Sequence, residues 1–187
     1  MDKHYSIIVV GAGIAGSAAA TTFARQGHDV LLLERSLKEP DRIVGELLQP
    51  GGVIALEKLG LAAALEGIDA VPVRGYHIYW KSEEVTFYYP SEHRENGETG
   101  FSAPVIASSG DAKGNARPEG RSFHHDGFVS QLRELARSEK KVTVVESTVT
   151  SFAVDKLTGR VIGVNCMNSQ KHNKTVSPLR LECRPFH

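Results

Sequence analysis

The chain has 187 residues, 22 basic and 22 acidic side chains and a hydrophobic fraction of 41%. These values fit a globular domain with a real core, and the zero net charge gives no indication of a nucleic-acid partner. Two cysteines are too few for a disulfide framework, and the sequence predicts neither a signal peptide nor a membrane-spanning helix, which would need about 20 apolar residues in a row.

Residues 7–16 have the pattern of a strand that runs into a glycine turn and then a helix. The turn has the form GxGxxG. Gly11 is expected to allow the tight turn, Gly13 to let the main chain approach a pyrophosphate, and Gly16 to let the helix pack closely on a sheet. A helix N-terminus also carries unpaired N–H groups and about half a positive charge, which suit phosphate oxygens. The pattern therefore predicts a dinucleotide site.

A helix is predicted over residues 14–26, with Gly27 as its C-terminal cap. Five side chains at helical spacing are expected to face the sheet: Ala15, Ala18, Ala19, Thr22 and Phe23. The second strand, residues 29–33, ends at Glu34, near the spacing of about 20 residues expected for a ribose-binding acid. The alternative is a glycine-rich turn beside a surface glutamate. The agreement of strand, helix and acid favours the nucleotide.

Residues 34–52 form a charged stretch followed by a glycine-punctuated one. Arg42 would offer a fixed, charged fork to a pyrophosphate, and glycines in this stretch would let the main chain lie against a flat ring. The alternative is a solvated loop in which Arg42 pairs with Asp41 or Glu46.

The run EPDRIVGELLQPGG at residues 39–52, placed after GAGIAG and the Glu34–Arg35 pair, resembles the squalene epoxidases. These are flavin-dependent members of the para-hydroxybenzoate hydroxylase-like monooxygenases. The resemblance implies an α/β, Rossmann-type FAD-binding domain with an inserted β-hairpin. It also implies that FAD is contacted by Ile14, Ala15, Glu34, Arg35 and Arg42.

A packing helix is predicted over residues 53–65, and the alternating pattern of residues 71–90 predicts an aromatic β-hairpin. These aromatics are either the wall of a substrate pocket or the buried face of a half-exposed sheet. By the resemblance, Tyr76 matches a tyrosine that the family places near the flavin and the substrate. Residues 91–120 show no periodicity and are predicted to be a mobile surface loop.

A second helix is predicted over residues 128–138, capped by Asp126, with four apolar side chains facing inward: Phe128, Leu132, Leu135 and Ala136. The run GRSFHHDGFVSQLREL is similar to the family segment that sets an arginine against FAD, which places Arg133 there. The pair His124–His125 has no third ligand at sensible spacing, so no metal site is expected.

A third parallel strand is predicted over residues 142–146, followed by a hairpin of residues 148–154 and 160–167. By the resemblance, Val149 touches the adenine side of FAD. The resemblance covers residues 5–179, so we expect an FAD-binding domain over residues 1–179, incomplete at its C-terminus, and an atypical tail over residues 180–187. In the family, the part that follows completes the flavin site and the squalene pocket and carries helices that sit on a membrane.

The implied function is that of an FAD-dependent squalene monooxygenase, which makes (S)-2,3-epoxysqualene with O2 in sterol or triterpenoid biosynthesis. Electrons from NADPH would come through an NADPH-cytochrome reductase, at the cytosolic face of the endoplasmic reticulum. One alternative is a truncated, catalytically inactive flavin-binding remnant. Another is an NAD-dependent reductase, against which the long segment around Arg42 argues.

Overall fold

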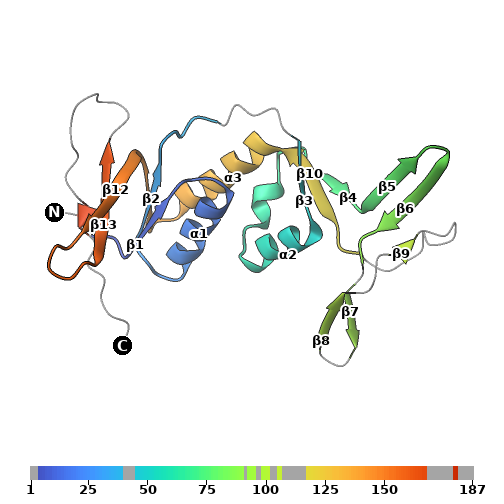
Figure 1. The fold of residues 1–187 in the computed structure, drawn as a ribbon, viewed down its shortest axis with the longest axis horizontal. Coiled ribbons are helices and arrows are strands. Elements are labelled where there is room, and N and C mark those ends of the chain that lie inside the picture. The colour runs from blue at the N-terminus through green and yellow to red at the C-terminus, as the bar shows by residue number, and fades with distance from the viewer. Residues whose placement is uncertain are drawn as a thin grey trace. The chain divides into compact units, whose positions relative to one another are not determined.

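The structure is a computed structural model that describes residues 4–39, 45–90, 92–95, 98–101, 105–106, 117–167 and 179–180. The chain divides into two compact units. Unit 1 consists of Met1–Arg42 and Asp126–His187, and unit 2 of Ile43–His125. Both contain helices and strands, and Figure 1 labels most of them, numbered in chain order. Among the described residues, no helix is long and apolar enough to cross a membrane.

Unit 1 contains a parallel sheet of three strands in the order β1-β2-β11. The strands are β1 (Ile7–Val10), β2 (Val30–Glu34) and β11 (Val142–Glu146). Helix α1 (Ile14–Arg25) connects β1 to β2, and α3 (His125–Ser138) precedes β11. This is the Rossmann-like α/β arrangement that the first 35 residues predict, and the third parallel strand is confirmed.

The core of unit 1 is built on both faces of β2, whose first four residues are fully buried. On one face, Val30 and Leu32 pack with alanines that include Ala20, Ala24 and Ala136. On the other, Leu31 and Leu33 pack with Val164 and Cys166. The latter two belong to β13 (Val161–Met167), which pairs antiparallel with β12 (Thr148–Val154), while β14 (Leu179–Arg180) pairs with β13. A strand covered on two faces must be apolar along its covered length, as β2 is at its first four positions.

The inner face of α1 differs from the prediction. The buried residues are Ser17, Ala20, Thr21 and Ala24, whereas Ala15 and Phe23 are exposed. The helix has small side chains all round, so hydrophobic spacing could not select a face. The close approach at Gly16 selects it instead, because a Cβ there would lie 1.8 Å from the Gly11 carbonyl oxygen. The helix ends at Arg25, one residue before the predicted Gln26, and Gly27 follows with a φ of 98°, as a glycine at a helix end does.

Unit 2 contains an antiparallel sheet in the order β3-β10-β4, formed by β3 (Gly45–Leu48), β10 (Gly120–His124) and β4 (Val71–Val73). The predicted helix over residues 53–65 is interrupted: α2 spans Pro50–Lys58, and a separate 3-10 turn, η1, spans Ala62–Leu65. Gly60 lies between them with a φ of 69°, a left-handed conformation that ends an α-helix.

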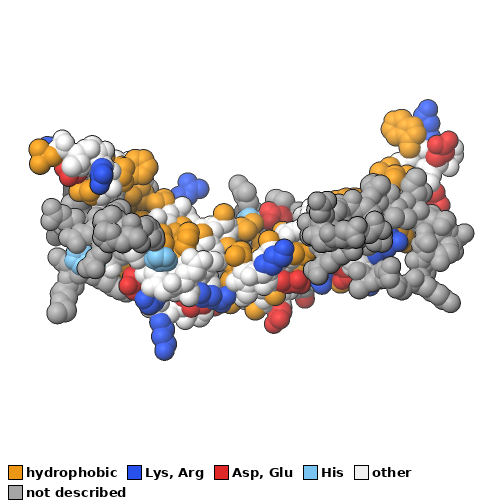
Figure 2. Space-filling model, turned by 90° about the horizontal axis from the view of Figure 1, so that it is seen from below, with side chains coloured by type: hydrophobic (Ala, Val, Ile, Leu, Met, Phe, Trp, Pro, Cys, Tyr) orange, Lys and Arg blue, Asp and Glu red, His pale blue; other side chains and the backbone are white. Residues whose placement is uncertain are grey.

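The predicted hairpin is formed by β5 (Gly75–Trp80) and β6 (Glu83–Tyr88), with Tyr76 opposite Phe87. Residues 71–73 belong to the other sheet instead. Hydrophobic side chains reach the surface in Figure 2, and Tyr79 and Trp80 are 72% and 70% exposed. The aromatics of β5 are therefore not the buried face of a sheet.

The described parts of residues 91–120 contain strands, so the prediction of a loop throughout is wrong. They are β7 (Glu92–Glu95), β8 (Glu98–Phe101) and β9 (Val105–Ile106). Strands β7 and β8 pair antiparallel, and β9 adds to the edge of β6. Because this stretch contains many polar residues, the sequence pattern did not reveal these short strands. Helix α3 also starts earlier than predicted, at His125, so Asp126 lies in its first turn rather than capping it.

Candidate dinucleotide-binding site

The glycine turn lies between β1 and α1. Gly11 has a φ of 97° and its N–H donates to the carbonyl of Leu33 at 2.7 Å, which ties the turn to the end of β2. Gly13 is the N-cap residue of α1, and no side chain caps the helix. A Cβ on Gly13 would meet nothing within 4 Å, and both Ile14 and Ala15 are exposed. The start of α1 therefore offers main-chain N–H groups to an anion in open space.

Glu34 lies at the end of β2 with its carboxylate directed at this turn. Oε2 accepts a hydrogen bond from the Ala12 N–H at 2.7 Å, and Oε1 accepts one from the Ser36 N–H at 3.0 Å. The side chain is only 12% exposed. Each carboxylate oxygen can accept a further hydrogen bond, so ribose hydroxyls could still be bound. The neighbouring Arg35 is exposed.

Arg133 of α3 contacts the same turn from the other side. Its Nε donates to the Ala12 carbonyl at 2.7 Å, Nη1 donates to the Lys38 carbonyl at 3.0 Å, and Nη2 lies 4.0 Å from Glu34 Oε2. Arg133 is 8% exposed. Sequence reasoning selected Arg133 but missed Ala12 and Lys38, because main-chain acceptors leave no side-chain pattern.

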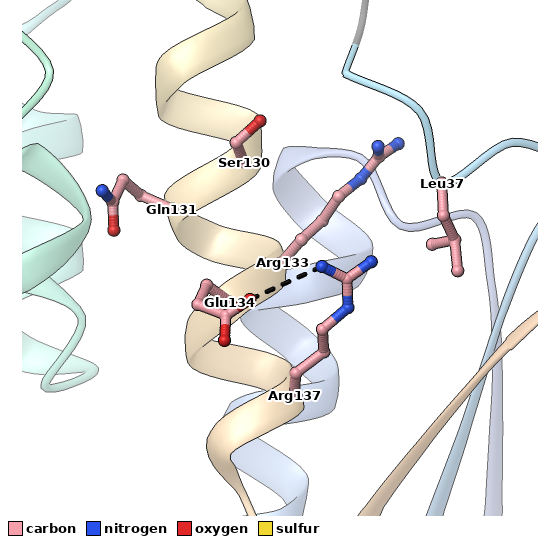
Figure 3. A pocket seen from close by; sticks show the side chains of 6 residues that line it. All are labelled: Leu37, Ser130, Gln131, Arg133, Glu134 and Arg137. Carbon is pink, nitrogen blue, oxygen red and sulfur yellow. Dashed lines mark hydrogen bonds and ion pairs between the residues drawn. The ribbon is translucent and has the colours of Figure 1, made fainter.

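Beside Arg133 the structure has a small cavity of about 260 Å³. Its lining consists of Leu37 and five residues of α3: Ser130, Gln131, Arg133, Glu134 and Arg137. In Figure 3 the side chains of Arg133 and Arg137 extend from α3 towards the segment with Leu37, while Gln131 points away. Arg137 pairs with Glu134 at 3.5 Å, and the Leu37 N–H donates to Glu146 Oε2 at 2.9 Å. The segment that follows β2 is thus fastened to α3 and to β11.

Two further predicted contacts differ in their surroundings. Val149 of β12 is half-buried, and its side chain packs against the cluster of Leu31, Leu33 and Cys166. A β-bulge follows it, between Val149 and Ser151. Arg42 lies outside the described residues.

Tyr76 belongs to unit 2, where Gln49 Nε2 donates to its hydroxyl at 2.5 Å. Its ring meets the Tyr89 ring edge-on, with centroids 5.7 Å apart. The Tyr89 hydroxyl is buried, and it lies close enough to the Tyr76 hydroxyl for each phenol to shift the pKa of the other. The Tyr89 hydroxyl, and after it Gln49, lowers the pKa of Tyr76. Burial, and after it Tyr76, raises the pKa of Tyr89 to about 12.

Two adjacent histidines, His124 and His125, lie where β10 ends. One is exposed, and the other contacts a glutamate. His125 Nδ1 lies 2.7 Å from Glu46 Oε1, a contact within unit 2. His124 is exposed. In the part of the chain that the structure describes, no three metal-binding side chains gather at one place.

Residues 9–37 match the family model of the NAD(P)-binding Rossmann-like domain. A squalene epoxidase of Gibberella zeae is 46% identical over 167 residues, which cover 88% of this chain and 32% of that protein. A squalene epoxidase of Aspergillus fumigatus is 47% identical, covering 88% of this chain and 30% of that protein. A squalene monooxygenase of Panax ginseng is 39% identical, covering 95% of this chain and 29% of that protein.

Solved structures share the fold at lower identity. A probable FAD-dependent monooxygenase of Pseudomonas aeruginosa, PqsL, is 21% identical with a TM-score of 0.62 and covers 88% of this chain and 38% of its own. The p-nitrophenol 4-monooxygenase of Pseudomonas putida is 16% identical with a TM-score of 0.63, covering 91% and 38%. The chain spans about a third of the length of the curated relatives it matches. Over most of its length, the chain is similar in sequence to the squalene epoxidases.

Proposed function

We propose that this chain is the dinucleotide-binding part of an FAD-dependent squalene monooxygenase. Identity of 46% with a squalene epoxidase over 88% of the chain is the observation that carries the proposal. The geometry supports the cofactor, because an uncapped helix start, an open Gly13 and an acid at the end of β2 are the parts that an ADP group needs.

In this proposal, the main-chain N–H groups at Gly13, Ile14 and Ala15 bind the pyrophosphate, and Glu34 accepts hydrogen bonds from the adenosine ribose. By the family resemblance, Val149 lies on the adenine side of the cofactor. By the family resemblance, Arg35, Arg42 and Arg133 also belong to the cofactor site. Most of these groups belong to a turn whose shape the protein's own hydrogen bonds hold, so little ordering would be needed on binding.

The reaction would consume squalene, O2, NADPH and a proton and yield (S)-2,3-epoxysqualene, water and NADP+. Bound FAD would supply the oxygen chemistry, because amino-acid side chains on their own do not activate O2. An NADPH-cytochrome reductase would deliver the electrons, and the enzyme would work at the endoplasmic reticulum membrane. Tyr76, with its exposed ring and its hydroxyl fixed by Gln49, is proposed to line the squalene pocket.

Titration of the purified protein with FAD, FMN and NAD+ tests the cofactor, with flavin fluorescence and competition by ADP as readouts. FAD is expected to bind and to be displaced by ADP, whereas FMN should bind far more weakly because it lacks the adenosine that the turn recognises. Binding of NAD+ in preference to FAD would favour a nicotinamide enzyme. A protein that binds none of the three would contradict the proposal.

Squalene turnover is tested separately, because the chain spans about a third of its relatives. The FAD-loaded protein is incubated with squalene, NADPH and a cytochrome reductase, and the products are separated by mass. Epoxysqualene would support the full activity. FAD binding without turnover would restrict the chain to the cofactor-binding role.

A further inference from the structure

The hairpin of β12 and β13 has an apolar face that unit 1 covers only at its base (Figure 1). Phe152 lies opposite Val164, and cross-strand partners share a face of a sheet. Val164 is buried in the cluster that packs on β2, whereas Phe152 is 68% exposed. Nearer the turn, Val154 and Val161 lie opposite each other, and both are exposed. Apolar side chains therefore continue past the covered base of the hairpin up to its turn.

The turn itself, residues 155–160, holds Leu157 in solvent at 96% exposure. Its shape is fixed by local hydrogen bonds. The Asp155 N–H donates to the Arg160 carbonyl at 2.8 Å, and the Gly159 N–H donates to the Asp155 carbonyl at 2.8 Å. Asp155 Oδ1 also accepts from the Leu157 N–H at 2.8 Å, which is typical of an Asx-turn. An ordered turn therefore displays this leucine to the surroundings.

The fully exposed charges of this turn have one sign. Lys156 and Arg160 are both exposed, on either side of Leu157 in the turn. The acid of the turn, Asp155, is half-buried, and its carboxylate is directed at the Leu157 N–H. An apolar side chain between two cations complements a surface that has hydrocarbon beneath a layer of anionic groups. That combination is the chemistry of an anionic lipid surface.

The hairpin of β5 and β6 also ends in exposed apolar side chains but has the opposite charge. Trp80 lies opposite Glu83, and Tyr79 lies opposite Glu84. Both glutamates are exposed, and an anionic surface would repel them. Its tip therefore lacks the charge complementarity of the β12–β13 turn and provides a matched comparison.

We propose that the turn of the β12–β13 hairpin docks on an anionic lipid surface, with Leu157 in the outer hydrocarbon and Lys156 and Arg160 at the lipid phosphates. The inference goes beyond the proposed function and does not depend on FAD. A protein partner fits the turn less well, because a stable protein interface takes about 20–30 residues a side. One leucine and two cations bind weakly, so the turn would act together with a second membrane contact.

Sedimentation with lipid vesicles tests the proposal on the purified protein without added FAD. Binding to vesicles of phosphatidylcholine with phosphatidylserine should exceed binding to phosphatidylcholine alone by on the order of tenfold and should fall as salt rises. Leu157→Ser should lower binding to the anionic vesicles about fivefold or more. The double variant Lys156→Gln, Arg160→Gln should bring it close to the level of the neutral vesicles. Circular dichroism checks that these surface variants are folded.

Trp80→Ser is the matched control, because it removes a similarly exposed apolar side chain from the other hairpin tip. Its binding to anionic vesicles should stay within about twofold of the wild-type protein. A loss as large as that of Leu157→Ser would overturn the assignment to the β12–β13 turn. Absence of vesicle binding would also overturn it, as would a dimer in sedimentation velocity that Leu157→Ser dissociates. FAD titration of the same protein remains an independent test of the proposed function.

Tryptophan fluorescence locates the contact directly. Trp80 is the chain's single tryptophan, so the double variant Trp80→Phe, Leu157→Trp moves the fluorophore to the β12–β13 turn. Anionic vesicles that contain brominated lipid should quench this variant and shift its emission to the blue. The wild-type protein, whose fluorophore is at the other tip, should be quenched far less. Equal quenching of the two proteins, or none in the variant, would contradict the proposal.

Discussion

Gly13 and Gly16 lie three residues apart in the glycine turn but have opposite surroundings. A Cβ on Gly16 would lie 1.8 Å from the Gly11 carbonyl oxygen, whereas a Cβ on Gly13 would meet nothing. Gly16→Ala should therefore lower the free energy of unfolding by about 1–3 kcal/mol. Gly13→Ala should change it by less than about 0.5 kcal/mol but weaken FAD binding, because the added methyl group would occupy the pyrophosphate's place. Urea unfolding and FAD titration of both variants check this.

The outcome for Gly13→Ala separates a ligand site from a structural turn. If the variant binds FAD as tightly as the wild-type protein, the pyrophosphate does not lie against this residue. If instead both variants unfold equally easily, the space around Gly13 is not open as described.

Tyr89 has a buried hydroxyl that lowers the pKa of the exposed Tyr76. Because this hydroxyl is the largest cause that lowers the pKa of Tyr76, Tyr89→Phe should raise that pKa towards its ordinary value of about 10. The titration at about 12 that belongs to Tyr89 should disappear with it. Tyrosine labelled with ¹³C at Cζ resolves each phenol by NMR across the pH range. Tyr79→Phe, at a side chain 72% exposed, is the control, and an unchanged Tyr76 pKa in Tyr89→Phe would refute the coupling.

At the scale of elements, two glycines, one in α2 and one just after it, are expected to affect stability in opposite directions when replaced by alanine. Gly51 lies inside the helix with open space around it, so Gly51→Ala should raise the free energy of unfolding by about 0.5 kcal/mol. Gly60 has a φ of 69°, and Gly60→Ala should lower the free energy of unfolding by about 1–2 kcal/mol. Urea unfolding followed by circular dichroism measures both. A higher free energy of unfolding in Gly60→Ala would mean that Gly60 does not hold a left-handed conformation, and a lower one in Gly51→Ala would mean that the space around Gly51 is not open.

The elements of unit 1 that contain strong local signals could be predicted from the sequence. The glycine turn, the buried strand β2 and the parallel strand β11 follow from glycine spacing and apolar runs. The buried face of α1 could not be predicted, because alanine and threonine occur on several sides of the helix. The close contact at Gly16 determines which side faces the sheet. Strands β7 to β9 could not be predicted either, because their many polar residues give no strand pattern. Hydrogen-bonded pairing with neighbouring strands forms them.

The candidate site shows the same division. The place of Glu34 beside the glycine turn was predictable from the number of residues between them in the sequence. The place of Arg133 was predictable only from the family resemblance. The partners of Arg133 are main-chain carbonyls of Ala12 and Lys38, which any residue type could provide. No pattern of side chains records such acceptors, so the arrangement that holds the turn needed a structure.

At the scale of the molecule, unit 1 is assembled from two separate stretches of chain. Met1–Arg42 contributes the turn and Glu34, and Asp126–His187 contributes α3 and β11. All of unit 2 lies between them in the sequence. Closing so long a loop has an entropic cost that grows slowly with length, and the contacts of Arg133 and the pairing of β11 with β2 offset it.

ADP should therefore slow amide hydrogen exchange in unit 1 and leave the exchange of the β5–β6 hairpin unchanged. Every contact proposed for the ADP half of FAD comes from unit 1, and a ligand slows amide exchange where it stabilises local structure. Peptides covering the start of α1, the end of β2 and the Arg133 turn of α3 should exchange more slowly with saturating ADP. Hydrogen exchange followed by mass spectrometry measures this, with Gly13→Ala as the control that should lose the protection. Equal protection of Gly75–Tyr88 by ADP would show that the nucleotide binds elsewhere.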